Sequence, residues 1–251
     1  MTRYRAAGYY LLGSLIVATA VFLPIYFLWY PWALFEKAGG RELFQLIVAV
    51  DLVVGPLLVF IVFVPGKKGL AFDLVSIAVL QSAALAYGIF VLFESRPVYI
   101  VFVKDRFELV RANDIPEQEL EKPESGTYAS LPRLGPRIIG ARIPTDPDEQ
   151  FRMMMSALDG LDIQSFPKYY IPYGDVRAQV MARAEPLSRL RELNGQRIAE
   201  IDRLVAKLGR AEGGLRFLPM RAGPRVDVTV IVDAASGDLL DIAALRPWEY
   251  K

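Results

Sequence analysis

Few side chains in this protein could carry out chemistry, because its 251 residues include no histidine and no cysteine. Without them the chain has no Ser-His-Asp triad, no thiol nucleophile, no disulfide and no imidazole or thiolate ligand for zinc. Carboxylates remain, and Asp233, Asp238 and Asp241 lie close together near the end of the chain. Their spacing fits no calcium-binding loop, and aspartates commonly form turns. We therefore expect no catalytic residue, no cofactor and no metal, in a protein that is not an enzyme.

One carboxylate stands out by its surroundings. Asp51 lies in the apolar stretch VAVDLVVGPLLVFIVFVPGKKGLAFDL, residues 48–74, and is followed by Gly55 and Pro56. A carboxylate in the middle of a membrane helix costs about 2.5–3.5 kcal/mol on insertion scales, so Asp51 is expected to face other helices. Gly55 lies one turn further along and permits close helix approach. Pro56 has no N–H to donate, which predicts a kink.

Three interpretations of this polar, kinked face remain open. Asp51, Gln81 and the Gly55-Pro56 step could hold the helices of this chain together, or they could form the face on which a partner's membrane helix docks. A third interpretation is a proton or ion path, for which a single chain offers few helices.

The elements that must position these residues are three long apolar stretches, residues 8–30, 43–64 and 70–93. A helix needs roughly 20 apolar residues to cross a bilayer. None of the three stretches has the polar face of a helix on the surface of a soluble protein. We therefore predict three transmembrane helices, with the lipid bilayer as a partner.

Basic residues predict the orientation of these helices. Arg3 and Arg5 precede the first stretch, and Lys67 and Lys68 lie in the turn between the second and the third. The positive-inside rule puts both pairs in the cytoplasm. In a bacterium this predicts a multi-pass inner-membrane protein with a cytoplasmic N-terminus and a periplasmic C-terminal domain.

The first stretch also has features of a signal peptide, since Ala18-Thr19-Ala20 is similar to a cleavage site. However, the apolar stretch continues past this point into an aromatic group typical of a membrane–water interface. That group consists of Tyr26, Trp29, Tyr30 and Trp32. We interpret the stretch as an uncleaved anchor.

Composition divides the chain near residue 94. Residues 1–94 hold six basic and five acidic residues, whereas residues 95–251 hold 23 of each. We predict a three-helix transmembrane region over 1–94 and a periplasmic domain over 95–251. The second domain has no net charge, so no nucleic acid is expected as a partner.

The second domain is predicted to be α+β, with a small antiparallel sheet and helices packed on it. Residues 98–103 and 107–111 form one predicted hairpin. The alternating valines of 226–232, a turn, and residues 239–242 form another. Residues 112–147 contain six prolines and predict an irregular surface stretch.

Helices are predicted from apolar spacing in two places. Residues 187–208 predict one or two amphipathic helices with a break at Gly195. Asp146 and Pro147 look like the cap and first position of another helix. Its apolar residues are Phe151, Met154, Met155 and Leu158. We expect them to face the core, although consecutive methionines are also typical of an adaptable binding surface.

The loop FPKYYIPYGD, residues 166–175, brings together Tyr169, Tyr170 and Tyr173. These tyrosines could contact a partner, but tyrosine and proline loops also pack over the edges of a core. Both interpretations remain open.

The order of these stretches resembles the type IV pilin accessory proteins of the TfpX/TfpZ group. The resemblance rests on WYP (29–31), VDLVVGPLLVFIVFVPGKKGLAFDL (50–74), AALAYGIFVLFESRPVYIVFVKDRFELV (83–110), VIVDAASGDLLDI (230–242) and RPW (246–248). It covers nearly the whole chain, although residues 112–225 match only in their proline and tyrosine content.

The resemblance implies a non-enzymatic accessory protein, or chaperone, that binds a type IV pilin subunit and assists its stability or its assembly into pili. The alternative is a membrane-anchored periplasmic receptor for a ligand or peptide. The hypothetical partner-binding residues are Asp51, Gly55, Pro56, Gln81, Tyr169, Tyr170 and Tyr173. The sequence carries no signal for an oligomeric state.

Overall fold

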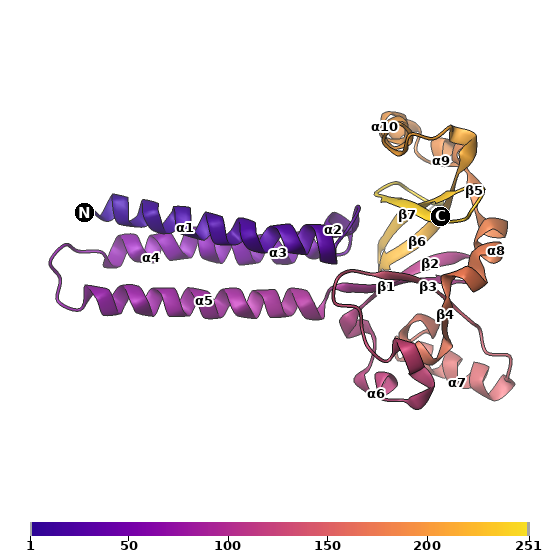
Figure 1. Ribbon diagram of the computed structural model, residues 1–251, viewed down its shortest axis with the longest axis horizontal. Helices are drawn as coiled ribbons and strands as arrows, with labels where there is room; N and C mark the ends of the chain where they lie inside the picture. Colours follow the sequence, from indigo (N-terminus) through magenta and orange to yellow (C-terminus); the bar gives the residue numbers. More distant parts are fainter. Residues whose placement is uncertain (1, 250–251) are drawn as a thin grey trace.

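The computed structural model describes residues 2–249 of the protein. Three helical stretches, Arg3–Trp29, Gly40–Val62 and Leu70–Glu94, are long and apolar enough to cross a membrane. They lie side by side and extend from the sheet-containing part of the molecule (Figure 1). These stretches confirm the three expected spans, whereas the orientation of the spans stays a prediction.

The first two spans each contain a π-helical turn next to a proline. Span one is α1 (Arg3–Pro24) followed by a π-helical turn, Ile25–Trp29. Span two is α3 (Gly40–Ala49), a π-helical turn, Val50–Val54, and α4 (Gly55–Val62), and span three is α5 (Leu70–Glu94). In span two the N–H of Gly55 donates to the carbonyl of Val50, five residues back. Because Pro56 cannot donate, the irregularity expected there takes the form of a wider turn that contains Asp51.

Beyond the spans, eight strands form one sheet in the order β4-β3-β1-β2-β6-β7-β8, with β5 paired to β6. The strands are β1 (Pro97–Val103), β2 (Arg106–Arg111), β3 (Arg137–Ala141), β4 (Tyr170–Pro172), β5 (Glu185–Pro186), β6 (Leu215–Gly223), β7 (Val226–Asp233) and β8 (Leu239–Ala243). The pairs β1–β2 and β7–β8 confirm the two expected hairpins. The α+β class is confirmed as well, but the sheet is larger than expected and mixed. Its parallel pairs are β1–β3 and β2–β6.

The strand β3 lies inside the proline-rich stretch that we expected to be irregular. It has only five residues, and it is held by parallel pairing to β1 and by helix α8 (Tyr173–Arg183). A Cβ at Gly140 would overlap the side chain of Val176, so a glycine lets α8 pack directly on this strand. These stabilising partners are distant in sequence, which is why local pattern alone missed the strand.

Helices pack on both faces of the sheet. In β7, Val228, Val230 and Val232 join the cluster that contains the core residues of α8, whereas Ile231 joins the cluster beneath α9 (Leu187–Leu193) and α10 (Ile198–Leu208). The helices α9 and α10 confirm two amphipathic helices separated near Gly195.

The spans and the sheet share one hydrophobic cluster at their junction. Ile25, Tyr30 and Leu92 from the ends of the spans pack in the same cluster as strand residues such as Ile100 and Phe102. The short helix α2 (Leu34–Lys37), from the loop between spans one and two, contributes Leu34 and Phe35. Tyr30 is fully buried and therefore belongs to this core, although we expected it in the aromatic group at the membrane–water interface.

Hydrogen bonds close the junction between the first loop and the sheet. The N–H of Ala33 donates to the carbonyl of Ile242 in β8 at 3.3 Å. The guanidinium of Arg111 donates both to the carbonyl of Ala38, at 3.2 Å, and to that of Ala222 in β6, at 3.1 Å. The loop that precedes span two is therefore fixed to strands that are far away in sequence.

Helix α7 (Pro147–Leu158) begins as expected, because the side chain of Asp146 accepts from the N–H of Glu149 at 3.1 Å. The expectation that its apolar residues face the core is wrong. Phe151, Met154, Met155 and Leu158 are 59%, 58%, 45% and 78% exposed. Met153 packs against the core instead, so the helix rests on its other face.

A candidate helix-binding groove in the membrane

Asp51 occupies the middle of span two, and its side chain is buried, with 7% exposure. Span two is the central helix of the three, since α1 packs on α4 and α5 packs on both α3 and α4 (Figure 1). Asp51 therefore lies at the floor of the space that α1 and α5 flank. The carboxylate accepts no hydrogen bond from any side chain or backbone group within residues 2–249.

A groove of about 370 Å³ lies over Asp51, between α1 and α5. We call it the Asp51 groove. It is lined by Tyr9, Tyr10, Gly13, Ser14, Val17, Asp51, Ala78, Gln81, Ser82 and Leu85. Small residues from both walls keep the groove wide, and a Cβ added at Gly13 would meet no atom within 4 Å. Small residues on a membrane helix allow another helix to approach closely.

The floor of the Asp51 groove is polar and only partly satisfied. Gln81 is 7% exposed, and among the described residues its Oε1 has no hydrogen-bond partner. A polar atom without a partner in an apolar environment carries a large free-energy cost. The structure thus brings Asp51 and Gln81, which are 30 positions apart in the sequence, to one groove where both could bond to a polar group on another helix.

Gly55 and Pro56 do not line the Asp51 groove. They affect how the helices pack and bend. A Cβ at Gly55 would lie 2.6 Å from the Cε1 of Tyr10, so the glycine lets α1 approach span two. Gly88 does the same for span three, because a Cβ there would lie 2.6 Å from the Cγ1 of Ile47. Pro56 lies one residue beyond Gly55, which directly follows the π-helical turn that contains Asp51.

A second groove, of about 350 Å³, shares Asp51 and Leu85 with the first but opens between α3 and α5. We call it the apolar groove. It is lined by Leu43, Leu46, Ile47, Val50, Asp51, Ala84, Leu85, Tyr87, Gly88 and Val91. Apart from Asp51 and the hydroxyl of Tyr87, its lining side chains are hydrocarbon, which suits acyl chains.

All three tyrosines that we singled out make contacts within the sheet-containing part. Tyr170 is buried, its ring packs against Tyr99 and Tyr128, and its hydroxyl donates to the carbonyl of Gln164. Burial raises the pKa of Tyr170 well above its usual value. Tyr170 is therefore a core residue in this structure.

Tyr173 and Tyr169 are partly exposed. The hydroxyl of Tyr173 donates to the carbonyl of Gly237 at 2.5 Å, and burial raises the pKa of Tyr173 to about 12. Tyr169 packs edge-on against Phe166, with the ammonium of Lys168 4.6 Å from its ring. These tyrosines lie with the sheet, apart from the groove in the spans, and their contact with a partner stays a prediction.

The acidic residues near the C-terminal end are bound to cations and turn amides of the same chain. Asp233 forms an ion pair with Arg210 and accepts from two N–H groups of the following turn at 2.8 Å. Asp241 pairs with Lys207 at 2.5 Å, and Asp238 pairs with Arg177 at 2.6 Å. These contacts are those of turn-forming and pairing residues.

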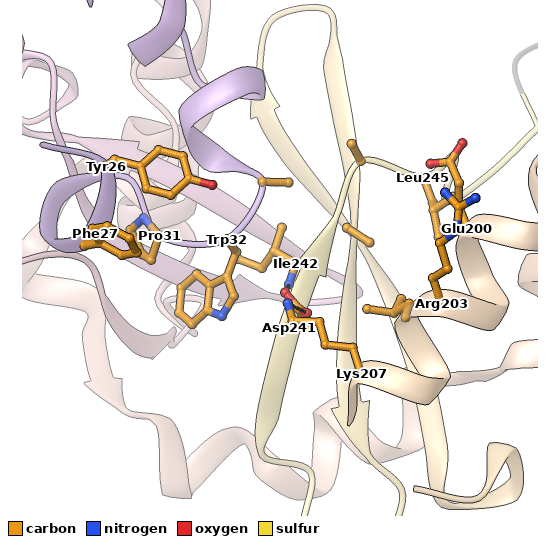
Figure 2. A pocket seen from close by; sticks show the side chains of 14 residues that line it. Tyr26, Phe27, Pro31, Trp32, Glu200, Arg203, Lys207, Asp241, Ile242 and Leu245 are labelled. Carbon is orange, nitrogen blue, oxygen red and sulfur yellow. Dashed lines mark hydrogen bonds and ion pairs between the residues drawn. The ribbon is translucent and has the colours of Figure 1, made fainter. Parts of the chain in front are cut away.

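A further crevice, of about 490 Å³, lies at the junction of the spans and the sheet. Figure 2 shows Tyr26, Phe27 and Trp32 from span one and its following loop on one side, and Arg203 and Lys207 of α10 on the other. The sequence alone did not connect these residues, because the contact joins parts of the chain that are far apart.

The walls of the Asp51 groove were missed as well, although Gly13-Ser14 and Ala78 with Ser82 carry the signal of small residues on one helix face.

The chain is similar to fimbrial assembly proteins of Dichelobacter nodosus. It is 29% identical to the serogroup I protein and 28% identical to the serogroup E1 protein, each over 234 residues that cover 91% of this chain and 90% of the relative. It is 36% identical to the protein of serogroups C1 and C2 over 118 residues, which cover 46% of this chain and 90% of that relative. No family model and no solved structure matches the chain.

Proposed function

Because the chain belongs to the family of fimbrial assembly proteins, we propose that it is a membrane-embedded accessory protein that takes part in fimbrial assembly. In this role it binds a fimbrial subunit, a type IV pilin, and assists its stability or its assembly. It acts by binding rather than by catalysis, in keeping with relatives that are named as assembly proteins.

The observation that carries the proposal is the Asp51 groove. A type IV pilin that awaits assembly has one membrane helix, and a protein that holds it in the bilayer needs a face for that helix. The Asp51 groove lies between α1 and α5 and has walls of small residues and two polar side chains at its floor. The apolar groove offers only Asp51 and the hydroxyl of Tyr87 as polar contacts, and its other lining side chains are hydrocarbon.

The groove would recognise its helix by packing and by hydrogen bonds. Gly13, Ser14, Ala78 and Ser82 allow close approach, from which dispersion contacts gain most. A polar or positively charged group at mid-membrane depth on the partner would meet Asp51 and Gln81. Such a contact offsets the cost of two polar side chains in the bilayer, which is larger when they have no partner.

The same proposal includes the membrane in which the protein lies and the orientation of its spans in that membrane. Arg3 and Arg5 at one end of span one and Lys67-Lys68 in the turn before span three favour a cytoplasmic N-terminus by the positive-inside rule. Lys67 is bound at 2.7 Å to Asp73 at the start of α5, which leaves Lys68, Arg3 and Arg5 as the other charges at this end. The sheet then lies on the extracytoplasmic side of a bacterial inner membrane.

The proposal is tested by measuring the level of the fimbrial subunit in a deletion strain and by testing whether the subunit co-purifies with the protein. Deleting the gene is expected to lower the level of the fimbrial subunit or the number of surface fimbriae, and an epitope-tagged copy of the protein in membranes is expected to co-purify with the subunit. Normal subunit level and normal fimbriae in the deletion strain would sink the proposal.

A reporter that is active only outside the cytoplasm, fused after Lys251, tests the orientation separately. We expect it to be active, because residues 2–249 contain three spans and the N-terminus is proposed to be cytoplasmic. A silent extracytoplasmic reporter, together with an active cytoplasmic one at the same site, would reverse the orientation.

A further inference from the structure

Exposed apolar side chains outside the spans gather on one helix. From residue 95 to residue 249, seven large apolar side chains are exposed: Leu134, Ile143, Phe151, Met154, Met155, Leu158 and Ile198. Four of the seven belong to α7, a helix of 12 residues. Single exposed apolar residues are ordinary on a protein surface, but a contiguous group marks an interaction site. We call the four residues Phe151, Met154, Met155 and Leu158 the α7 stripe.

The α7 stripe faces directly away from the rest of the domain. At about 100° per residue, positions 149, 153 and 156 share one face of the helix, and the stripe occupies the opposite face. The first face holds the helix in place: Met153 packs on the core cluster, and Glu149 forms an ion pair with Lys168 at 3.3 Å. Turning the stripe inward would break both contacts, so the stripe is a stable feature of the surface.

The bilayer does not cover the stripe. The spans extend from one side of the sheet, and α7 lies at the far end of the molecule from them (Figure 1). A membrane that surrounds the spans therefore does not reach α7, and the occupant of the stripe is a protein.

The charged residues around the α7 stripe indicate which kind of protein surface binds to it. Residues 146–168 hold five acidic and two basic residues, a net charge of −3. The acidic residues are Asp146, Asp148, Glu149, Asp159 and Asp162. Glu149 lies on the packed face and pairs with Lys168, whereas Asp148 and Asp159 flank the stripe and form its acidic rim. Two copies of this chain meeting through the stripe would bring two acidic rims together, which disfavours self-association. A surface with apolar side chains edged by lysines or arginines fits both the stripe and its rim.

We infer that the α7 stripe is a second docking face, which binds an apolar protein surface with a basic rim on the same side of the membrane as the sheet. Resting on the proposed function, this surface belongs to the head domain of the fimbrial subunit whose membrane helix occupies the Asp51 groove. Two methionines in the stripe suit this role, because their flexible side chains adapt to partners of different shape. One partner is thus bound at two points, one in the bilayer and one beyond it.

The experiment uses the full chain in membranes together with an epitope-tagged fimbrial subunit. Because the chain has no cysteine, Met154→Cys gives one site for a thiol-linked photo-crosslinker. Ala206→Cys is the matched control, exposed on α10 at the opposite end of the sheet-containing part in Figure 1. Ala78→Cys places the same probe in the Asp51 groove. We expect crosslinks to the subunit from Met154→Cys and Ala78→Cys, and none from Ala206→Cys.

Each outcome decides the matter. A crosslink from Ala78→Cys without one from Met154→Cys overturns the second docking face and leaves the proposed function standing. A crosslink from Met154→Cys to a second copy of this chain also overturns it. Equal crosslinks from Met154→Cys and Ala206→Cys mean contact without specificity, which overturns it too. Loss of all crosslinks defeats both proposals.

Variants test the chemistry of the face. Phe151→Glu with Leu158→Glu is expected to lower the Met154 crosslink about tenfold, since central apolar contacts dominate binding at an interface. Asp148→Lys with Asp159→Lys is expected to lower it less, and chiefly at low salt. Both pairs are exposed, so the melting temperature of the protein should stay unchanged. An unchanged crosslink in both pairs contradicts the inference.

Discussion

The three spans pack completely against the sheet at one end, but they leave a groove between them half-way along their length. At the junction with the sheet, Tyr30, Leu34 and Leu92 are fully buried in a cluster shared with the strands. Half-way along the same spans, Asp51 and Gln81 lie at the floor of a groove, and the Oε1 of Gln81 has no hydrogen-bond partner among the described residues. The same helices thus form a completed core at one end and an incomplete contact in the middle. A completed core serves stability, whereas an incomplete contact is what a binding site looks like before its partner arrives.

The largest expected effect on stability is at the closed end. Tyr30→Ala removes a fully buried ring and its hydroxyl contact with the carbonyl of Ser95, 3.2 Å away. Removing a buried aromatic side chain costs about 3–5 kcal/mol. Chemical unfolding of the protein in detergent should show this loss, with Tyr30→Phe close to wild type. If Tyr30→Ala unfolds like wild type, the spans and the sheet do not share a core that matters for stability.

The next effect separates the two grooves and concerns binding. Ser82→Leu fills the Asp51 groove, whereas Ala84→Leu, two residues away on the same helix, fills the apolar groove. We expect Ser82→Leu to lower subunit co-purification about tenfold, because a bulky side chain prevents close helix approach. Ala84→Leu should leave co-purification unchanged, and both variants should fold as wild type. Equal effects, or a larger effect of Ala84→Leu, would contradict the choice of groove.

A smaller effect is expected at Asp51 itself. Asp51→Asn keeps hydrogen-bonding capacity and should retain subunit binding, whereas Asp51→Leu removes it. A hydrogen bond between membrane helices contributes about 0.6 kcal/mol on average, so Asp51→Leu should weaken binding roughly threefold. Measurement of subunit co-purification across both variants checks this. Complete loss of activity in Asp51→Asn, with the protein still present in the membrane, would favour an ion path instead.

The smallest effect concerns a buried hydroxyl in the sheet. Within residues 2–249 the hydroxyl of Tyr99 has no hydrogen-bond partner, and burial raises the pKa of Tyr99 to about 12. Tyr99→Phe should therefore change stability by less than about 1 kcal/mol. Above pH 10 the unfolded tyrosine ionises before the folded one, so the wild type loses stability between pH 10 and about 12. Tyr99→Phe should lose less over that range in pH-dependent unfolding, and an identical loss would show that Tyr99 does not titrate with folding.

Sequence pattern predicted the elements better than it predicted their contacts. The spans, both hairpins and the Asp146 cap follow from local rules of length, alternation and capping, and these were right. The strand β3 depends on a parallel partner and on α8, neither of which is near it in the sequence. The stripe on α7 has the spacing of a core face, and only tertiary packing reveals that Met153, on the other side of the helix, is the residue that docks.

The candidate site was predicted in part. Asp51 and Gln81 attracted attention because polar side chains are rare in apolar stretches, and the structure brings them to one groove. The walls of that groove consist of small residues, which are a signal in the sequence, but small residues occur on several faces of the spans and the sequence does not show which of them line a groove. Gly55 proved to be a contact for Tyr10 rather than part of the groove, which only the distance between the two residues could show.

The hydrogen bond from the N–H of Ala33 to the carbonyl of Ile242 determines when the junction between the spans and the sheet can form during synthesis. Strand β8 is synthesised long after helix α2, because Ala33, just before α2, and Ile242 of β8 lie about 200 positions apart in the chain. While the spans enter the bilayer, Leu34 and Phe35 therefore lack the strand residues that pack against them in the finished protein. This hydrogen bond cannot form until the chain has been synthesised through β8, so the junction is completed after all three spans have been made. A ribosome that stops before β8 would release a chain whose first loop lacks its hydrogen bond to that strand.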